Sequence, residues 1–167
     1  IKAESPQTTT IVGGVYPTLS REVVMDDPNI DFIVLSEGEE RLPKLLRAIK
    51  AGGGFEDIDG LCFRIDGKWR VQPHTGIGIA ELDSLPWPDY SDYDMSRYLN
   101  WTQRYTQNFQ FRQLPVVMMM TSRGCPYKCT YCAAGNINNP LNTGTRTRSP
   151  EDVLGAVSYT HLRAHET

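Results

Sequence analysis

Three cysteines lie close together in the run CPYKCTYC, where Cys125, Cys129 and Cys132 are four and three positions apart. Thiolate sulfur is a ligand for zinc and for iron–sulfur clusters. The opening residues IKAESPQTTT carry no apolar core of a secretory leader, and dense cysteine without secretory signals indicates metal binding or catalysis more often than disulfides. One short loop can wrap these sulfurs around a single centre, so we expect a metal site here.

Two kinds of metal centre fit three neighbouring thiolates. Structural zinc takes a closed tetrahedral shell with a second Cys or His pair downstream, and the sequence shows no such pair. A four-iron cluster held by protein alone takes four cysteines, and the fourth cysteine of the chain is Cys62, in a predicted hairpin strand where a small buried side chain is expected. Three ligands would leave one iron open for chemistry. The alternative to such a catalytic cluster is a non-catalytic zinc-binding module or an iron–sulfur electron-transfer module.

The run CPYKCTYC resembles the C-x3-C-x2-C signature of radical S-adenosylmethionine enzymes, including the aromatic Tyr131 before the last cysteine. The resemblance implies that the three cysteines hold a [4Fe-4S] cluster whose fourth iron binds S-adenosylmethionine. An electron from the cluster would then cleave S-adenosylmethionine to a deoxyadenosyl radical. The resemblance also implies that Tyr131 lies near the adenosine, and that the loop follows the first strand of a partial α/β barrel.

The elements around the loop fit this arrangement. Residues 116–120 (VVMMM) are predicted to form a buried strand, and Gly124 permits a tight turn before the first cysteine. After the loop, Ser149 is a predicted N-cap and Pro150 the first residue of a helix with acidic residues in its first turn. The unit is therefore predicted to run strand, cysteine loop, helix.

The last ten residues, SYTHLRAHET, resemble a translated sequencing-adapter tail. We therefore expect the helix to break off after Val157 and residues 158–167 to be foreign. His161 and His165 then have no role as metal ligands.

The first fifty residues alternate strand and helix, which predicts an α/β fold with a mostly parallel sheet. Residues 8–12 form a predicted strand ending in Gly13-Gly14, and residues 31–35 form an apolar strand that we expect to be buried on both faces. A short helix is predicted over residues 19–25, with Thr18 or Ser20 as its N-cap. A longer helix is predicted over residues 39–51, with Gly52 as its stop and an apolar face made of Leu42, Leu45, Leu46 and Ile49.

The dipeptide Asp66-Gly67 predicts a two-residue hairpin turn between residues 61–65 and 68–72. This turn sets Cys62 opposite Val71 and Arg64 opposite Trp69. Residues 81–101 are rich in Pro, Asp and aromatic side chains, and we interpret them as an ordered connector because the aromatic rings need surfaces to cover.

The run TTTIVGGVYPT, followed by DFIVLSEGEE, resembles the later half of the cobalamin-binding domain of one class of radical S-adenosylmethionine enzymes. The resemblance implies that Gly13 and Gly14, which lack a Cβ, let the backbone approach the nucleotide tail of cobalamin. A plain turn after the strand is the alternative interpretation. The family commonly has Gly-Glu-Gly-Glu where this chain has Ser36-Glu37-Gly38-Glu39, and we interpret the acidic residues as a solvated helix start without a catalytic role.

The resemblances imply three pieces. Residues 1–52 are expected to form the C-terminal half of a Rossmann-like cobalamin-binding domain, residues 53–114 a β-hairpin and connector, and residues 115–157 the start of a radical S-adenosylmethionine barrel of the partial TIM type. A complete TIM barrel takes about 250 residues. We therefore expect a fragment of a cobalamin-dependent enzyme that is inactive by itself, with the true N-terminus missing before Ile1.

Composition limits the partners. A net charge of −3 without a basic patch argues against nucleic-acid binding. The longest apolar run, residues 116–120, is far shorter than the roughly 20 residues of a membrane span. We expect a cytoplasmic enzyme that acts on a small molecule by methyl transfer or anaerobic oxidative cyclisation, with an external electron donor such as a flavodoxin or ferredoxin. The sequence does not indicate the substrate, and we assign no catalytic side chain.

Overall fold

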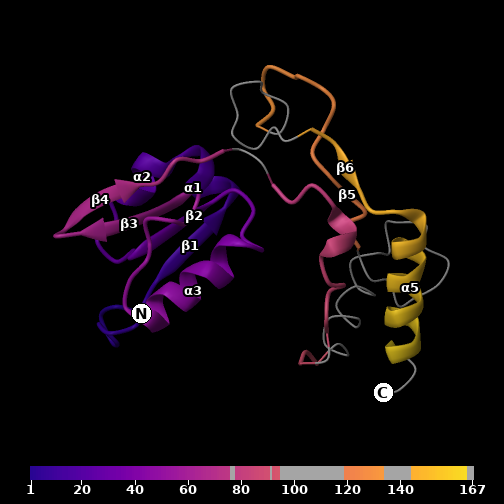
Figure 1. Cartoon of the computed structure of the whole chain (residues 1–167), viewed down its shortest axis with the longest axis horizontal. Coiled ribbons are helices and arrows are strands. Elements are labelled where there is room, and N and C mark those ends of the chain that lie inside the picture. Colours follow the sequence, from indigo (N-terminus) through magenta and orange to yellow (C-terminus); the bar gives the residue numbers. More distant parts are fainter. Residues whose placement is uncertain (76–77, 91, 95–118, 134–143, 165–167) are drawn as a thin grey trace, which may run out of the picture. The chain divides into compact units, whose positions relative to one another are not determined.

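The computed structural model describes residues 1–75, 78–90, 92–94, 119–133 and 144–164 (Figure 1). The chain divides into two compact parts, residues 1–80 with 124–145 and residues 81–123 with 146–167. Most of the strand predicted over residues 116–120 lies outside the described residues. Met119 and Met120 are described, and neither belongs to a strand.

The first part is built on a four-stranded mixed sheet in the order β1-β2-β3-β4. The strands β1 (Ile11–Gly14) and β2 (Phe32–Leu35) run parallel, whereas β3 (Leu61–Ile65) and β4 (Lys68–Val71) add antiparallel pairs. The predicted α/β class is confirmed. The sheet is mixed rather than mostly parallel because a two-residue turn can join only antiparallel strands.

The hairpin β3-β4 has the predicted register. Cys62 pairs with Val71 and Arg64 with Trp69. Asp66 and Gly67 both have positive φ, 50° and 74°, as the expected turn type requires. Because β3 also pairs with β2, the hairpin continues the first sheet, and the expected boundary after residue 52 does not coincide with an edge of that sheet.

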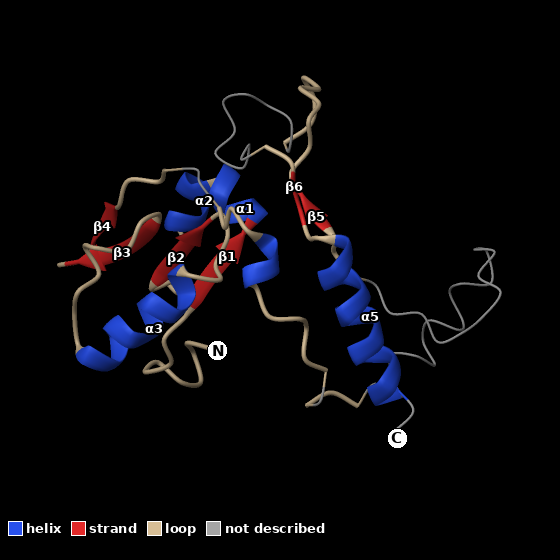
Figure 2. Ribbon diagram, turned by 45° about the vertical axis from the view of Figure 1, so that its right-hand side comes forward, coloured by secondary structure: helices blue, strands red, loops and turns tan. Residues whose placement is uncertain are grey.

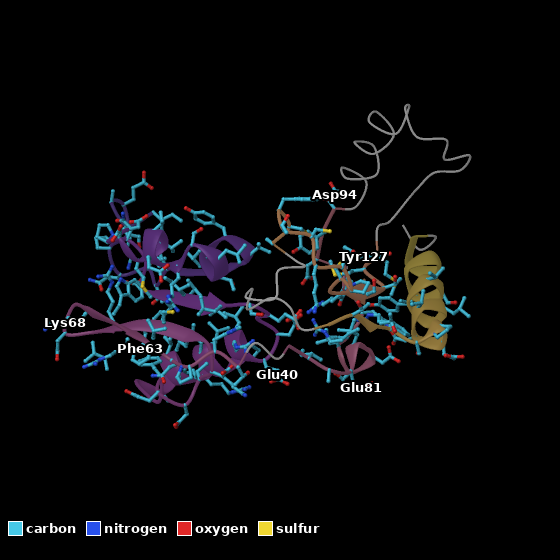
Figure 3. The ribbon with its side chains drawn as sticks, turned by 90° about the horizontal axis from the view of Figure 1, so that it is seen from above. Glu40, Phe63, Lys68, Glu81, Asp94 and Tyr127 are labelled. Carbon is cyan, nitrogen blue, oxygen red and sulfur yellow. The ribbon has the colours of Figure 1, made fainter. Side chains whose placement is uncertain are left out.

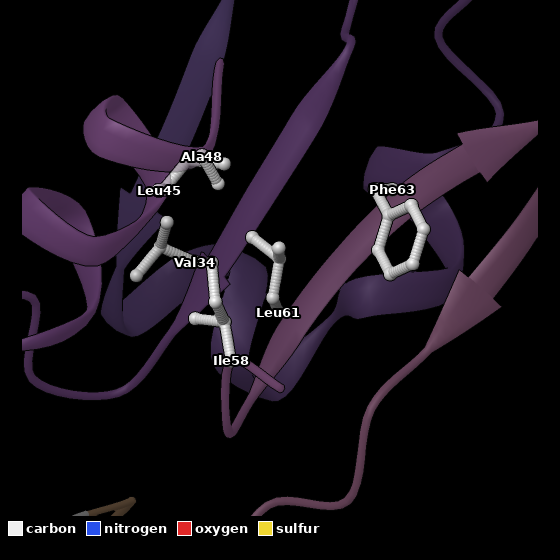
Figure 4. Packing of buried hydrophobic residues seen from close by; sticks show 6 residues of the cluster. All are labelled: Val34, Leu45, Ala48, Ile58, Leu61 and Phe63. Atoms are coloured by element: carbon white, nitrogen blue, oxygen red, sulfur yellow. The ribbon is translucent and has the colours of Figure 1, made fainter. Parts of the chain in front are cut away.

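Helices cover both faces of this sheet (Figure 2). The helices α1 (Val15–Leu19) and α2 (Arg21–Met25) follow β1, and α3 (Arg41–Ala51) follows β2. The cluster on the α3 face, shown in Figure 4, consists of Val34, Leu45, Ala48, Ile58, Leu61 and Phe63. The cluster on the α2 face consists of Val24, Ile33, Leu35 and Cys62. The alternation along β2 confirms that this strand is buried on both faces.

Helix α3 begins two residues later than predicted and ends as predicted, with Gly52 in the left-handed region at φ 78°. Its buried residues are Arg41, Leu45 and Ala48, and Ile49 packs against the same cluster. Leu42 and Leu46 belong to the predicted apolar face but are 39% and 52% exposed. The cluster beneath the helix takes apolar side chains from β2 and β3, with Ile11 of β1 packed against it.

The second part contains the short 3-10 helix η1 (Leu82–Ser84), the two-stranded sheet of β5 (Ser122–Arg123) and β6 (Arg146–Thr147), and the helix α5 (Pro150–Ala164). The Ser149 hydroxyl accepts a hydrogen bond from the Asp152 backbone N–H at 3.1 Å, which confirms the predicted N-cap.

The expected end of α5 after Val157 was wrong, because the helix continues to Ala164. Residues 158–164 contain neither Gly nor Pro to stop it. The foreign origin of residues 158–167 stays a prediction. Of the two histidines there, the His161 side chain and the whole of His165 lie outside the described residues.

Across the described ranges, none of the helices combines the length and apolar character that a membrane crossing requires.

Candidate functional site

The cysteine loop, residues 124–145, leaves β5 and returns to β6 (Figure 1). Gly124 has φ 88°, a conformation that favours glycine, so the backbone freedom expected before Cys125 is used, although no turn is assigned at this position. A turn lies between the later cysteines, where the Cys132 N–H donates to the Cys129 carbonyl at 3.1 Å. Cys129 and Cys132 are therefore presented at the two ends of one turn.

The neck of the loop is closed by backbone contact. A Cβ on Gly124 would overlap the carbonyl oxygen of Gly144, and it would lie 2.8 Å from the Gly144 carbonyl carbon. Only glycine fits this crossing, and just outside it Arg123 pairs with Arg146 in the β5-β6 sheet. Sequence reasoning missed Gly144, whose partner across the neck is twenty residues away and leaves no local pattern.

The three loop cysteines are free thiols of intermediate exposure. In number and chemistry they fit the donor set of an iron–sulfur cluster with one iron open to another ligand. Within the described part of the chain, no three His, Cys, Asp or Glu side chains lie close enough together to hold a metal ion. The structure thus places the predicted ligands on one loop without bringing their sulfurs to one point.

Two tyrosines of the loop face solvent. Tyr127, labelled in Figure 3, is 71% exposed, and Tyr131 is 91% exposed. Neither phenol ring is used to build the protein core. The Tyr131 ring is therefore available to a ligand at the loop.

Cys62 has a different environment from the loop cysteines. It is fully buried on the α2 face of the sheet, packed with Val24, Ile33 and Leu35. Burial raises the pKa of the Cys62 thiol to about 11, so the group stays protonated and is a poor metal ligand. Its predicted role as a small buried hydrophobic residue is confirmed. A zinc site or four-cysteine cluster that uses Cys62 receives no support.

The second candidate site is the carboxyl end of β1. Gly13 and Gly14 are the last two residues of that strand, so the pair is not a separate turn after it. A Cβ on Gly13 would lie 3.2 Å from the Val34 carbonyl oxygen, whereas a Cβ on Gly14 would meet nothing within 4 Å. Gly14 has φ 95° and ψ −161°, a conformation that is open essentially to glycine alone. Its exposed backbone fits the close approach of a ligand.

Thr18 connects the ends of the two parallel strands, β1 and β2. Its buried hydroxyl donates to the Gly14 carbonyl at 2.5 Å and accepts from the Ser36 N–H at 2.7 Å. Thr18 lies inside α1 and makes no cap for α2, so its predicted capping role was wrong, and Ser20 occupies the cap position without a side-chain hydrogen bond. The strand-end bridge is visible only in three dimensions, because its partners are far apart in sequence.

Ser36 follows β2 with φ 59°, in the left-handed region that glycine adopts more easily. This is the position at which the family commonly has glycine. Next to it, Glu37 accepts a hydrogen bond from the Ile79 N–H at 3.0 Å. That carboxylate is therefore engaged with the backbone rather than solvated, while Glu39 and Glu40 precede the helix.

Arg41 anchors the same segment to the sheet. Its side chain is nearly fully buried, pairs with the Asp59 carboxylate and donates to the Glu37 carbonyl at 2.9 Å. Burial works to raise the pKa of Asp59, but the Arg41 hydrogen bond and charge bring it below its usual value. Burial lowers the pKa of the nearby His74, and the positive charge of Arg41 lowers it further, so the imidazole is neutral near pH 7.

Comparison with known proteins identifies relatives for nearly the whole chain, although no family model matches it. The chain is 31% identical over 154 residues to an uncharacterised methyltransferase of Pyrococcus horikoshii, which covers 90% of this chain. It is 31% identical over 158 residues to the anaerobic magnesium-protoporphyrin IX monomethyl ester cyclase of Cereibacter sphaeroides, which covers 91%. It is 27% identical to the cytidylyl-2-hydroxyethylphosphonate methyltransferase of Streptomyces wedmorensis over 92% of the chain.

The chain is short beside these relatives, because it spans 30%, 23% and 32% of their respective lengths. Among solved structures it is similar to the cobalamin-dependent S-adenosylmethionine radical enzyme OxsB, determined with aqua-cobalamin and S-adenosylmethionine bound. That likeness has a TM-score of 0.63 at 21% identity and covers 89% of this chain and 18% of OxsB. At such an identity it shows the fold. The homologues of this chain are cobalamin-dependent radical S-adenosylmethionine methyltransferases and cyclases, and the chain matches only part of each of them.

Proposed function

We propose that the whole protein is a cobalamin-dependent radical S-adenosylmethionine enzyme in which Cys125, Cys129 and Cys132 hold a [4Fe-4S] cluster. The cysteine loop carries this proposal, because it presents three free, part-exposed thiols while Cys62 is buried and protonated. When bound, the cluster and S-adenosylmethionine supply the reductive cleavage that starts radical chemistry.

The residues of this chain would position these groups. The Gly124–Gly144 neck keeps the two ends of the loop together, which limits the volume that the three thiols can explore. The exposed Tyr131 ring would stack near the adenosine of S-adenosylmethionine. At the carboxyl end of β1, Gly14 would let the backbone approach the nucleotide tail of cobalamin, and Gly13 would keep β1 close to Val34.

The reaction class follows from the names of the relatives, which are methyltransferases and a cyclase. We propose methyl transfer or anaerobic oxidative cyclisation of a small molecule, with electrons from a flavodoxin or ferredoxin. The net charge of −3 supports a substrate other than nucleic acid. The four free cysteines support a reducing compartment, and we propose the cytoplasm.

We also propose a domain assignment. Residues 1–52 would be the later half of the cobalamin-binding domain, with the hairpin of residues 61–71 attached to it through the β2-β3 pairing. Residues 115–157 would begin the radical S-adenosylmethionine barrel, and residues 81–114 would connect the two.

Anaerobic reconstitution of the full-length protein with ferrous iron and sulfide tests the cluster. We expect about four irons per chain, and less than one after Cys125→Ala, Cys129→Ala or Cys132→Ala. Cys62→Ala is the matched control and should keep its iron, since this thiol lies in the apolar core. One zinc per chain, or loss of iron in a folded Cys62→Ala variant, would overturn the proposal.

Titration of the full-length protein with aquacobalamin tests the second cofactor. Gly14→Val should abolish binding, because a side chain would occupy the open space beside the β1 end. Gly54→Val is the control, since Gly54 also has positive φ with open space around its Cα but lies after α3. Equal loss of binding in both variants would mean that backbone strain, rather than the β1 end, is responsible.

A further inference from the structure

The start of helix α5 is bound to the segment that begins at Leu82. Asp152 accepts hydrogen bonds at both carboxylate oxygens, from Trp87 Nε1 at 2.9 Å and from Arg148 at 2.6 Å. Arg148 also donates to the Leu85 carbonyl at 3.2 Å. The Ser149 N–H, which precedes the helix, donates to the Asp83 carboxylate at 2.9 Å. We call this set, Asp83, Leu85, Trp87, Arg148, Ser149 and Asp152, the clamp.

The ion pair of the clamp, between Arg148 and Asp152, is largely buried. The side chains of Arg148 and Asp152 are 8% and 15% exposed. Hydrogen bonds from Arg148 and then from Trp87 lower the pKa of Asp152, so its carboxylate stays charged. A charged and largely buried pair whose side chains also bond to Trp87 and to the Leu85 carbonyl has one preferred geometry.

Gly155 shows how closely the Trp87 indole lies against the helix. Glycine in a helix interior is unfavourable, and α5 gives no caps or turns at this position that would call for it. A Cβ on Gly155 would lie 2.6 Å and 2.8 Å from two carbons of the indole ring. The glycine is therefore explained by the close packing of Trp87.

The clamp is connected to the base of the cysteine loop. The Arg148 N–H donates to the Thr121 carbonyl at 2.8 Å, directly before β5. Ser122 and Arg123 then pair with β6, which immediately precedes Arg148. The same few residues thus hold α5, both strands at the ends of the loop and the 82–87 segment.

We propose that Trp87, Arg148 and Asp152 are positioning residues for the cysteine loop, because they fix the strand pair from which Cys125 is presented two residues later. This inference rests on the proposed function, because it assumes that the cysteine loop holds the [4Fe-4S] cluster. It assigns residues 82–87, expected to be a connector, to the machinery that assembles the metal site.

The decisive test uses Gly155→Ala in the full-length protein, with and without Trp87→Ala. Alanine normally stabilises a helix interior relative to glycine. With Trp87 present, the added methyl group should displace the indole and accelerate amide exchange at Arg148 about tenfold. With Trp87→Ala, the same substitution should slow exchange in α5.

Iron content after anaerobic reconstitution provides the functional measurement. Trp87→Ala should lower iron to less than half the wild-type amount while exchange in the α3 amides is unchanged. Trp87→Phe keeps a ring against Gly155 but loses the hydrogen bond to Asp152, so its iron content should lie between those of Trp87→Ala and the wild type. Glu151→Gln, at the exposed carboxylate that directly precedes Asp152 in α5, is the matched control.

The outcomes separate the two proposals. If wild-type protein binds the cluster and Trp87→Ala binds it equally well, the positioning role is overturned and the cluster proposal stands. If wild-type protein binds no cluster, the cluster proposal fails, and amide exchange at Arg148 still decides whether the clamp holds the strand pair. A Gly155→Ala change that stabilises α5 in both backgrounds would exclude the close packing of Trp87.

Discussion

The two parts of the molecule are stabilised by different interactions. In the first part, apolar clusters lie on both faces of the four-stranded sheet, and Phe63, Ile33 and Leu45 are fully buried. In the second part, the described apolar residues that are buried are Leu82 and Ala156, and polar bonds from Trp87 and Arg148 connect the segments. The burial of apolar area dominates the first part, and directional hydrogen bonds dominate the second.

This difference affects how each candidate site is held. The end of β1 is a continuation of a packed strand, so its unusual backbone conformation at Gly14 is supported by the core behind it. The cysteine loop depends instead on a two-residue strand pair and one backbone crossing at Gly124. We therefore expect the first site to respond mainly to core packing and the second mainly to single backbone and polar contacts.

The largest effect is expected in the core of the first part. Phe63→Ala should lower the free energy of opening of the sheet by about 3–5 kcal/mol, because it removes a fully buried ring that packs against Phe55 at 5.4 Å between centroids. Amide exchange of β2 and β3 in the full-length protein measures this. Ile65→Ala, on the same strand and face but 39% exposed, is the control. If Ile65→Ala lowered the free energy of opening by a similar amount, the buried end of β3 would not be more important for stability than its exposed end.

The next effect concerns the neck of the cysteine loop. Gly124→Ala should cost about 3 kcal/mol at the loop, because positive φ and overlap with the Gly144 carbonyl act together. Gly144→Ala has comparable φ but open space, so about 1 kcal/mol is expected. Iron content of the reconstituted full-length variants should fall in the same order. The reverse order would show that the crossing does not control the loop.

The sequence predicted the elements that depend on local chemistry. Asp66-Gly67 specified the hairpin and its register, Gly52 specified the end of α3, and Ser149 with Pro150 specified the start of α5. Each signal lies within a few residues of the feature that it controls. Cys62 could be assigned to the core for the same reason, since its hairpin partner fixes its face.

Features that depend on distant residues could not be predicted. The closure of the loop joins Gly124 to Gly144, and the packing of Gly155 depends on Trp87, almost seventy positions earlier. The apolar pattern of α3 includes Leu42 and Leu46, which are 39% and 52% exposed, so the pattern did not show which of its residues meet the sheet.

A smaller effect is expected where Thr18 bridges the two strand ends. Thr18→Val keeps the volume but leaves the Gly14 carbonyl and the Ser36 N–H without the bridging hydroxyl, which should cost about 1–2 kcal/mol. Thr18→Ser keeps the hydroxyl and should lose less than half of that amount. Amide exchange at Ser36 in the full-length protein measures both. Faster exchange in Thr18→Ser than in Thr18→Val would show that the methyl group of Thr18, rather than its hydroxyl, is the important contact.

The smallest effect has the opposite sign. Ser36 holds φ 59° at the end of β2, and an L-residue in the left-handed region costs about 1 kcal/mol relative to glycine. Ser36→Gly keeps the backbone N–H that Thr18 accepts and should raise the local free energy of opening by up to about 1 kcal/mol, less the greater freedom of glycine in the unfolded chain. Ser36→Ala is the control, because it removes the hydroxyl and keeps the strain. If Ser36→Ala were clearly less stable than the wild type, the serine hydroxyl would be supporting this backbone turn, and the β2 end would depend on a polar side chain just as the second part of the molecule does.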